Sequence, residues 1–158
     1  MKKIIGYENP DMIIHLGDYV SDAKKLSAFF GDVIMVRGNN DYDNDVEFTK
    51  FVDICNIKIM LTHGHKFKVK NGVHRIKEMA AYAAENDAKT VMFGHTHEPY
   101  IRRFNGILVM NPGASINLSR KNYNPTYGIM QIENENIKLS IINVCTPAEG
   151  EMCRDRHG

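Results

Sequence analysis

Short apolar runs alternate with polar, glycine-rich turns along most of the chain. Residues 12–16 and 33–36 have the pattern of buried strands, and helix-forming residues fill 21–30 before Gly31 interrupts them. Strand, helix and strand in this order predict a βαβ unit, with parallel strands and a right-handed crossover.

The rest of the pattern predicts hairpins, one longer helix and one further apolar strand. The turn residues Asn105 and Gly106, for example, suit the tight type I′ turn of a two-stranded hairpin. The predicted hairpins cover residues 48–61, 100–110 and 127–144, the helix covers 72–87, and the single strand covers 90–93.

Composition narrows the classes of protein. The chain has 158 residues, with 20 Lys and Arg against 19 Asp and Glu. This near-balance excludes an electrostatic grip of the whole protein on nucleic acid or anionic lipid. No apolar run approaches a membrane span, and three scattered cysteines do not suggest a disulfide framework. We therefore expect a cytoplasmic protein with one domain over residues 1–144 and a disordered tail over 145–158; the pattern leaves open whether it forms a homo-oligomer.

Four predicted strands each end in a turn rich in Asp, Asn or His. Open α/β sheets bind ligands at the carboxyl ends of their strands, so parallel neighbouring strands would place these turns along one sheet edge. The turns are Gly17-Asp18, Gly38-Asn39-Asn40-Asp41, His63-Gly64-His65 and Gly94-His95-Thr96-His97.

Together, the four turns offer the donor types of a metal site. Asp18 supplies a carboxylate and Asn39 an amide oxygen, and three imidazoles come from His63, His95 and His97. Such a mixed set suits manganese, iron, zinc or nickel better than calcium or magnesium. Each turn alone also fits ordinary turn chemistry, since Gly, Asn and Asp are common turn formers. The repetition of one format four times favours the metal interpretation.

In this order, the four turns resemble the calcineurin-like metallophosphoesterase superfamily, and most closely its small bacterial and archaeal phosphodiesterase branch. The similarity runs from Asp11 to Val144. The resemblance implies a layered α/β/β/α sandwich, with two sheets face to face and helices outside. It also implies hydrolysis of a small-molecule or nucleotide-like phosphate ester by a metal-bridging hydroxide, with up to two divalent ions, manganese first among them.

The resemblance assigns the metal ligands residue by residue. It makes Asp18 the bridging carboxylate, with Asn39, His63 and His95 completing one site. His97 then belongs to the second ion.

Three further positions bear on catalysis. The catalytic set implied by the resemblance includes Asp18 and Asn39, and Asp41 as an orienting acid. His65 is a candidate to assist the leaving group, and an exposed turn histidine describes it equally well. Many family members have His where this chain has Asn40, which cannot donate a proton, so good leaving groups should be favoured.

The family's first motif, Asp-x-His at the end of the first strand, is not found in this sequence. Residues 1–8 resemble the end of the family's first helix, so the fold is expected to lack its first strand and much of that helix. We favour truncation of a longer protein over a degenerate member, because every later part of the site is present.

The alternative function is a non-catalytic scaffold for protein interactions, as in the retromer subunit of this fold. We interpret His15, inside the strand 12–16, as a satisfied core or interstrand histidine and not as a substitute ligand.

The segment between His65 and Lys77 carries five basic residues and no acid. A solvated loop and helix face is the favoured interpretation, with attraction of an anionic substrate as the alternative. The chain shows no continuous basic stripe with interleaved aromatics, so there is no strong nucleic-acid signal.

Overall fold

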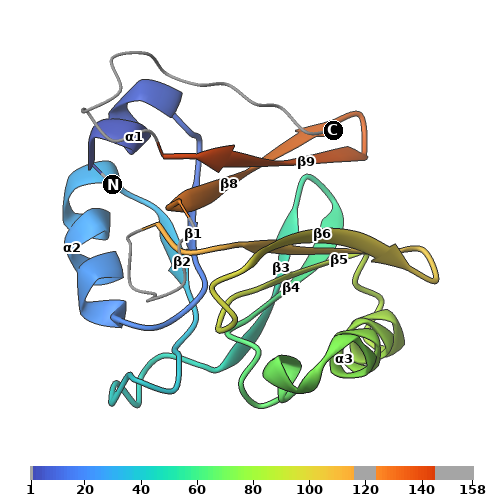
Figure 1. Cartoon of the computed structure of the whole chain (residues 1–158). Coiled ribbons are helices and arrows are strands. Elements are labelled where there is room, and N and C mark those ends of the chain that lie inside the picture. Colours follow the sequence, from blue (N-terminus) through green and yellow to red (C-terminus); the bar gives the residue numbers. More distant parts are fainter. Residues whose placement is uncertain (1, 116–123, 145–158) are drawn as a thin grey trace.

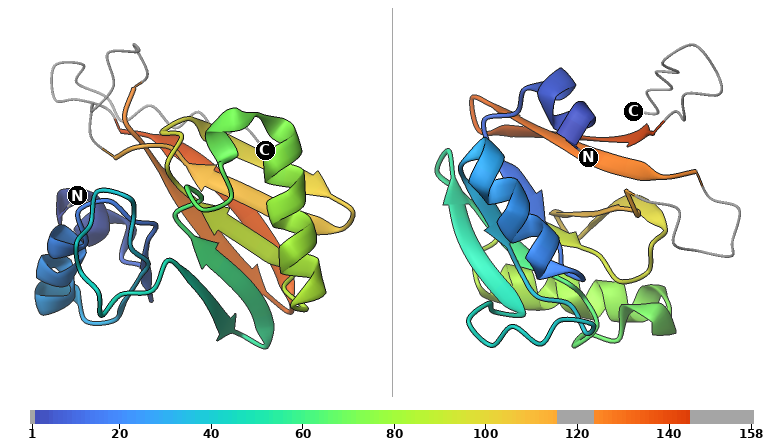
Figure 2. Two further views of the ribbon diagram at one scale, coloured as in Figure 1. Left: turned by 90° about the horizontal axis from the view of Figure 1, so that it is seen from below. Right: turned by 90° about the vertical axis from the view of Figure 1, so that its left-hand side faces the viewer.

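Two β-layers lie face to face in the computed structural model, which describes residues 2–115 and 124–144. One layer is a five-stranded sheet whose outer face is covered by helix α3 (Figure 1). The other layer consists of two separate strand pairs, with helices α1 and α2 on its outer side (Figure 2). This α/β/β/α layering is the architecture that the resemblance implies.

The five-stranded sheet has the order β3-β4-β5-β7-β6, in which β4, β5 and β7 run parallel. Its central strand β5 is buried at all four positions, as expected for a strand covered on both faces. The strands are β3 (Thr49–Ile54), β4 (Ile57–Thr62), β5 (Thr90–Phe93), β6 (Pro99–Phe104) and β7 (Ile107–Pro112).

The second layer contains the predicted βαβ unit and the last hairpin. Strands β1 (Ile13–His15) and β2 (Val33–Met35) are parallel and joined by α2 (Val20–Phe30). Strands β8 (Thr126–Glu133) and β9 (Asn136–Asn143) are antiparallel. The short helix α1 (Lys2–Glu8) precedes β1.

All three predicted hairpins are confirmed, and each turns through two residues with positive φ. Such turns match the right-handed twist of the strands they join. The final turn spans two residues, because β8 ends at Glu133 and β9 begins at Asn136 in the hydrogen-bonded pair. The turn residues are Cys55 (φ 50°) and Asn56 (62°), Asn105 (47°) and Gly106 (88°), and Asn134 (47°) and Glu135 (64°).

Two apolar cores hold the layers together. Helix α3 (Val73–Glu85) buries one face, including Met79 and Ala83, against β5 and β7. On the opposite face of the sheet, Ile59 and Met110 pack against apolar side chains from both strand pairs of the second layer. The second core therefore fixes the two layers, and with them the strand ends of both, against each other.

The expectation that the four polar turns line one sheet edge is wrong. The turns after β1 and β2 belong to the second layer, whereas those after β4 and β5 belong to the five-stranded sheet. The chain changes layer between β2 and β3, and the order of apolar runs does not show such a change. No described helix is both long and apolar enough to cross a membrane. The predicted tail, residues 145–158, lies outside the described residues, and the domain boundary stays a prediction.

Candidate metal centre

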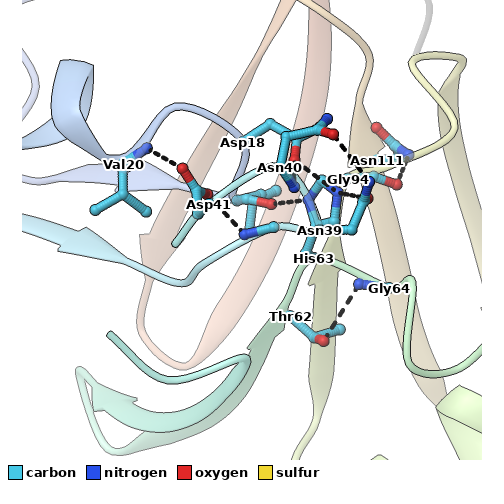
Figure 3. A network of polar contacts seen from close by, with 12 residues as sticks. Asp18, Val20, Asn39, Asn40, Asp41, Thr62, His63, Gly64, Gly94 and Asn111 are labelled. Carbon is cyan, nitrogen blue, oxygen red and sulfur yellow. Dashed lines mark hydrogen bonds and ion pairs between the residues drawn. The ribbon is translucent and has the colours of Figure 1, made fainter. Parts of the chain in front are cut away.

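The polar turns of the two layers converge at one place (Figure 3). Nε2 of His63, at the end of β4, lies 3.2 Å from Oδ1 of Asn39 and 3.5 Å from Oδ1 of Asp18, which both follow strands of the second layer. The ring of His95, after β5, has its centroid 5.0 Å from that of His63. The structure therefore brings four of the five predicted metal ligands together across the interface between the layers.

His63 has a defined tautomer, because its other ring nitrogen meets a backbone carbonyl. Nδ1 lies 2.7 Å from the carbonyl oxygen of Leu16, which can only accept a hydrogen bond, so Nδ1 carries the proton. Burial lowers the pKa of His63, more than its bond to Leu16 and the charge of Asp18 raise it. At neutral pH the ring is therefore uncharged, and Nε2 presents a lone pair.

This lone pair faces two oxygen acceptors. The amide of Asn39 donates through Nδ2 to Oδ1 of Asn40 at 3.2 Å, which leaves its Oδ1 directed at His63. Three acceptor atoms, from His63, Asn39 and Asp18, thus converge, and Oδ1 of Asp18 also accepts from the backbone amide of Asn40 at 3.2 Å. A divalent cation is the kind of ligand that such a set of nitrogen and oxygen lone pairs fits.

His63, Asn39 and Asp18 do not form a metal site made of ionisable side chains alone. Within residues 2–115 and 124–144, no group of three or more His, Cys, Asp or Glu side chains is arranged to hold a metal ion. The amide of Asn39 provides one of the converging donors, and the imidazole of His95 lies beside them.

The neighbouring imidazoles are also held in the uncharged form. Burial, followed by the charge of Lys70, lowers the pKa of His95 to about 4. Burial and the nearby His63 likewise lower the pKa of His65. Imidazoles bind metals only when unprotonated, so the cluster is ready for a cation at neutral pH.

Glycines allow the turns to approach this closely. Gly17 has φ of 94°, and a Cβ at this position would lie 2.6 Å from Nδ1 of His63. A Cβ on Gly38 would overlap the carboxylate of Asp18. Neither turn could hold its position with a side chain at these glycines.

Asp41 connects the second turn to the start of helix α2. Its Oδ1 accepts from the backbone amide of Val20 and its Oδ2 from that of Gly38, each at 2.8 Å. These bonds fix the backbone around Asn39 without contact to the imidazoles. The geometry is compatible with the predicted orienting role, which remains a prediction.

Two of the predicted residues lie at the margin of the cluster. In the described part of the chain, no hydrogen bond or ring contact joins His97 to the other predicted ligands, although its charge contributes to lowering the pKa of His63. The ring of His65 lies 5.4 Å from that of His63 and 6.0 Å from that of His95, and its Nδ1 is buried without a partner among the described residues.

Sequence reasoning missed Asn111 as a positioning residue. Its side chain is fully buried and donates to the Gly94 carbonyl at 2.8 Å and to Oγ1 of Thr96 at 2.9 Å. Its Oδ1 accepts from the amide of Gly113 at 2.9 Å. Asn111 therefore fastens the turn that carries two histidines to the end of β7. The sequence signal for it is the Asn-Pro-Gly segment at 111–113, which suggests a break after the strand and resembles the same family branch.

His15 lies in β1 opposite Met35 of β2, as an interstrand histidine would, but the expectation that its ring is satisfied by hydrogen bonds is wrong. Its Nδ1 is buried and has no hydrogen-bond partner among the described residues, and burial lowers its pKa. The side chain is half-buried in β1, near the charges of Asp41 and Asp22. Burial of an unbonded ring nitrogen is costly, which the strand pattern alone does not reveal.

Comparisons with known proteins connect this chain to phosphoesterases and to structures of the same fold. The chain matches the sequence model of the calcineurin-like phosphoesterase superfamily domain over residues 2–135. It is 32% identical over 123 residues to a probable metallophosphoesterase of Mycoplasma genitalium, covering 77% of this chain and 72% of that protein. It is 28% identical to a phosphodiesterase of Methanocaldococcus jannaschii, covering 89% and 87%. Wild-type Vps29 of Entamoeba histolytica complexed with Zn²⁺ has a similar fold, with a TM-score of 0.74, 19% identity and coverage of 92% and 81%.

Proposed function

Because the chain belongs to the calcineurin-like phosphoesterase superfamily, we propose that it is a metal-dependent phosphodiesterase. Its relatives include a protein named as a phosphodiesterase and another named as a probable metallophosphoesterase, which supports this reaction class. The substrate we propose is a small-molecule or nucleotide-like phosphate ester.

One observation carries the proposal: Nε2 of His63 lies 3.2 Å from Oδ1 of Asn39 and 3.5 Å from Oδ1 of Asp18, so three atoms that can each offer a lone pair converge. These three residues, with His95 beside them, would hold a divalent cation. When bound, such an ion neutralises charge on the phosphate oxygens and lowers the pKa of a bound water molecule. Manganese is our first choice; zinc, iron and nickel suit the same donors, and the Zn²⁺ complex of Vps29 supports a member of this group.

Residues around the ion site would orient the reaction. Asp41 keeps the turn of Asn39 in place through two backbone amides. The side chain of Asn40 cannot protonate a leaving group. His65, whose ring lies 5.4 Å from that of His63, has no assigned metal role, and its lowered pKa leaves little of the protonated ring at neutral pH. We therefore expect the rate to depend steeply on leaving-group pKa across a series of aryl phosphodiesters, and a flat dependence would count against this part of the proposal.

The proposal is tested with a chromogenic phosphodiester. Protein treated with EDTA and then supplied with Mn²⁺ should hydrolyse bis(p-nitrophenyl) phosphate. His95→Ala should lower kcat/KM by roughly 100-fold or more, since the ligand is lost. His74→Ala, at an exposed position of α3, is the matched control and should retain activity. Absence of metal-stimulated hydrolysis by the unaltered protein would contradict the proposal.

A second candidate is a metallophosphoesterase fold that serves as a protein-interaction scaffold. The position of His97, without a described bond to the other predicted ligands, favours a single metal site and thus this alternative. Metal stoichiometry separates the two functions. Two ions per chain with turnover support the enzyme, whereas one ion or none, without turnover, supports the scaffold.

A further inference from the structure

Two cationic side chains lie over the same aromatic ring next to the histidine cluster. Cζ of Arg37 is 3.8 Å from the ring centroid of Phe48, and Nζ of Lys66 is 4.6 Å from it. The ring attracts both cations, yet it does not neutralise either charge. The turn after β2 and the turn after β4 thus each place a positive group at the ring of Phe48.

Neither cation has an acidic partner within ion-pair distance in the described part of the chain. Nη1 of Arg37 donates to the backbone carbonyl of Asp43 at 3.0 Å and to Oδ1 of Asn44 at 2.9 Å. The carboxylate of Asp43 is instead bound by Lys24.

The guanidinium of Arg37 also keeps donors that no described group uses. Its Nη2 donates to no described atom, whereas its Nε is buried without an acceptor and out of reach of a ligand. A free guanidinium N–H is suited to an oxygen of a phosphate or carboxylate.

The pair lies close to the candidate metal ligands. The ring of Phe48 is 5.0 Å from that of His65, which in turn is 5.4 Å from His63. The charges of Lys66 and Arg37 act on His65 and contribute to its lowered pKa.

Only part of the basic run is directed to this place. Arg75 binds Glu78, and Lys77 lies over Phe104 on another part of the surface. These two residues fit the interpretation of a solvated basic face; Lys66 is also exposed, and its Nζ lies over Phe48.

We propose that Arg37 and Lys66, placed on either turn around Phe48, form an anion subsite that binds a second phosphate group of the substrate. This inference rests on the proposed function and narrows it. The preferred substrates are phosphodiesters that carry a further phosphate beyond the one that is hydrolysed. The subsite sits one imidazole ring away from the candidate metal ligands, so the two phosphates can belong to one small molecule.

The test compares two aryl phosphodiesters with the same leaving group, one with an uncharged second arm and one whose second arm ends in a phosphate. Lys66→Gln should lower kcat/KM for the phosphate-bearing ester by about tenfold, mainly through KM, because a charge-assisted contact is lost. The change in kcat/KM for the uncharged ester should be much smaller. Lys77→Gln, an exposed lysine elsewhere, is the control and should change neither. Equal losses on both esters, or no loss on either, would overturn the inference.

A second measurement separates this inference from the proposed function. If the unaltered protein hydrolyses neither ester, the proposed function fails, and the subsite is then judged by binding alone. Inorganic pyrophosphate, titrated calorimetrically in the presence of EDTA, should bind the unaltered protein several-fold more tightly than the Lys66→Gln and Arg37→Gln variants. Equal affinity for all three proteins would refute the subsite.

Discussion

Replacement of Asn111 with Ala should loosen the turn that carries His95. The buried amide makes three hydrogen bonds; its loss leaves the Gly113 amide without this acceptor, while the Gly94 carbonyl keeps only the backbone amide of Thr96 as a donor. Each hydrogen bond contributes about 1 kcal/mol, so we expect a total loss of about 3 kcal/mol in the free energy of unfolding. For a chain of this length, that corresponds to a fall of about 6–12 °C in Tm.

The same change should weaken metal binding, because residues that orient ligands affect affinity by about 10–100-fold when mutated. Thermal unfolding followed by circular dichroism gives the first quantity, and calorimetric titration with Mn²⁺ well below Tm gives the second. Asn136→Ala is the control, since Asn136 is exposed at the start of β9 and should change neither. An unaltered Tm and unaltered Mn²⁺ affinity in Asn111→Ala would refute the role we give this residue.

Three further outcomes follow from the geometry of the site. Gly38→Ala should weaken Mn²⁺ binding and cost about 1–3 kcal/mol of stability, because its Cβ would overlap the carboxylate of Asp18; Gly6→Ala, where a Cβ meets open space, should do neither. Asp41→Asn should lower Tm, since an amide cannot accept from both backbone N–H groups through two oxygens; an unchanged Tm would contradict this. Because the pKa values of His63 and His95 are lowered from 6.5, Mn²⁺ affinity should fall between about pH 7.5 and about pH 6 by less than the tenfold or so that two ordinary histidines would lose; a loss of about tenfold in calorimetric titrations at the two pH values would contradict this.

The same pKa shifts predict how the stability of the metal-free protein depends on pH. The folded state binds protons at His63 and His95 less readily than the unfolded state does, so their contribution to stability is fully present above pH 6.5. As pH falls below this value, the unfolded chain gains protons first and stability decreases, for His95 until about pH 4.

The local elements could be predicted because their signals are local. The Asn105-Gly106 pair predicted a tight hairpin, and both residues have the positive φ that this turn requires. Helix α3 was visible from apolar residues at helical spacing, which the structure buries against the sheet. The ligand types at the strand ends were also readable, since glycine and a polar donor follow each apolar run.

The arrangement of these elements could not be predicted in the same way. The order of apolar runs does not show that β1 and β4 belong to different layers, because a strand's partners depend on long-range packing. The acceptor that fixes the tautomer of His63 is the backbone carbonyl of Leu16, and any residue type would provide it. Nδ1 of His15 is buried without a hydrogen-bond partner among the described residues because of the packing around β1, and the residue type does not predict that packing.

The most direct test of whether His63, Asn39 and Asp18 bind a divalent cation is a crystal structure of the protein soaked in Mn²⁺, with the ion located by its anomalous scattering. We expect an anomalous peak next to Nε2 of His63 and the Oδ1 atoms of Asn39 and Asp18. The ring of His95 should be turned toward the peak, and Nδ1 of His63 should keep its hydrogen bond to Leu16. A peak remote from these atoms, or no peak at a saturating Mn²⁺ concentration, would contradict the proposed metal site.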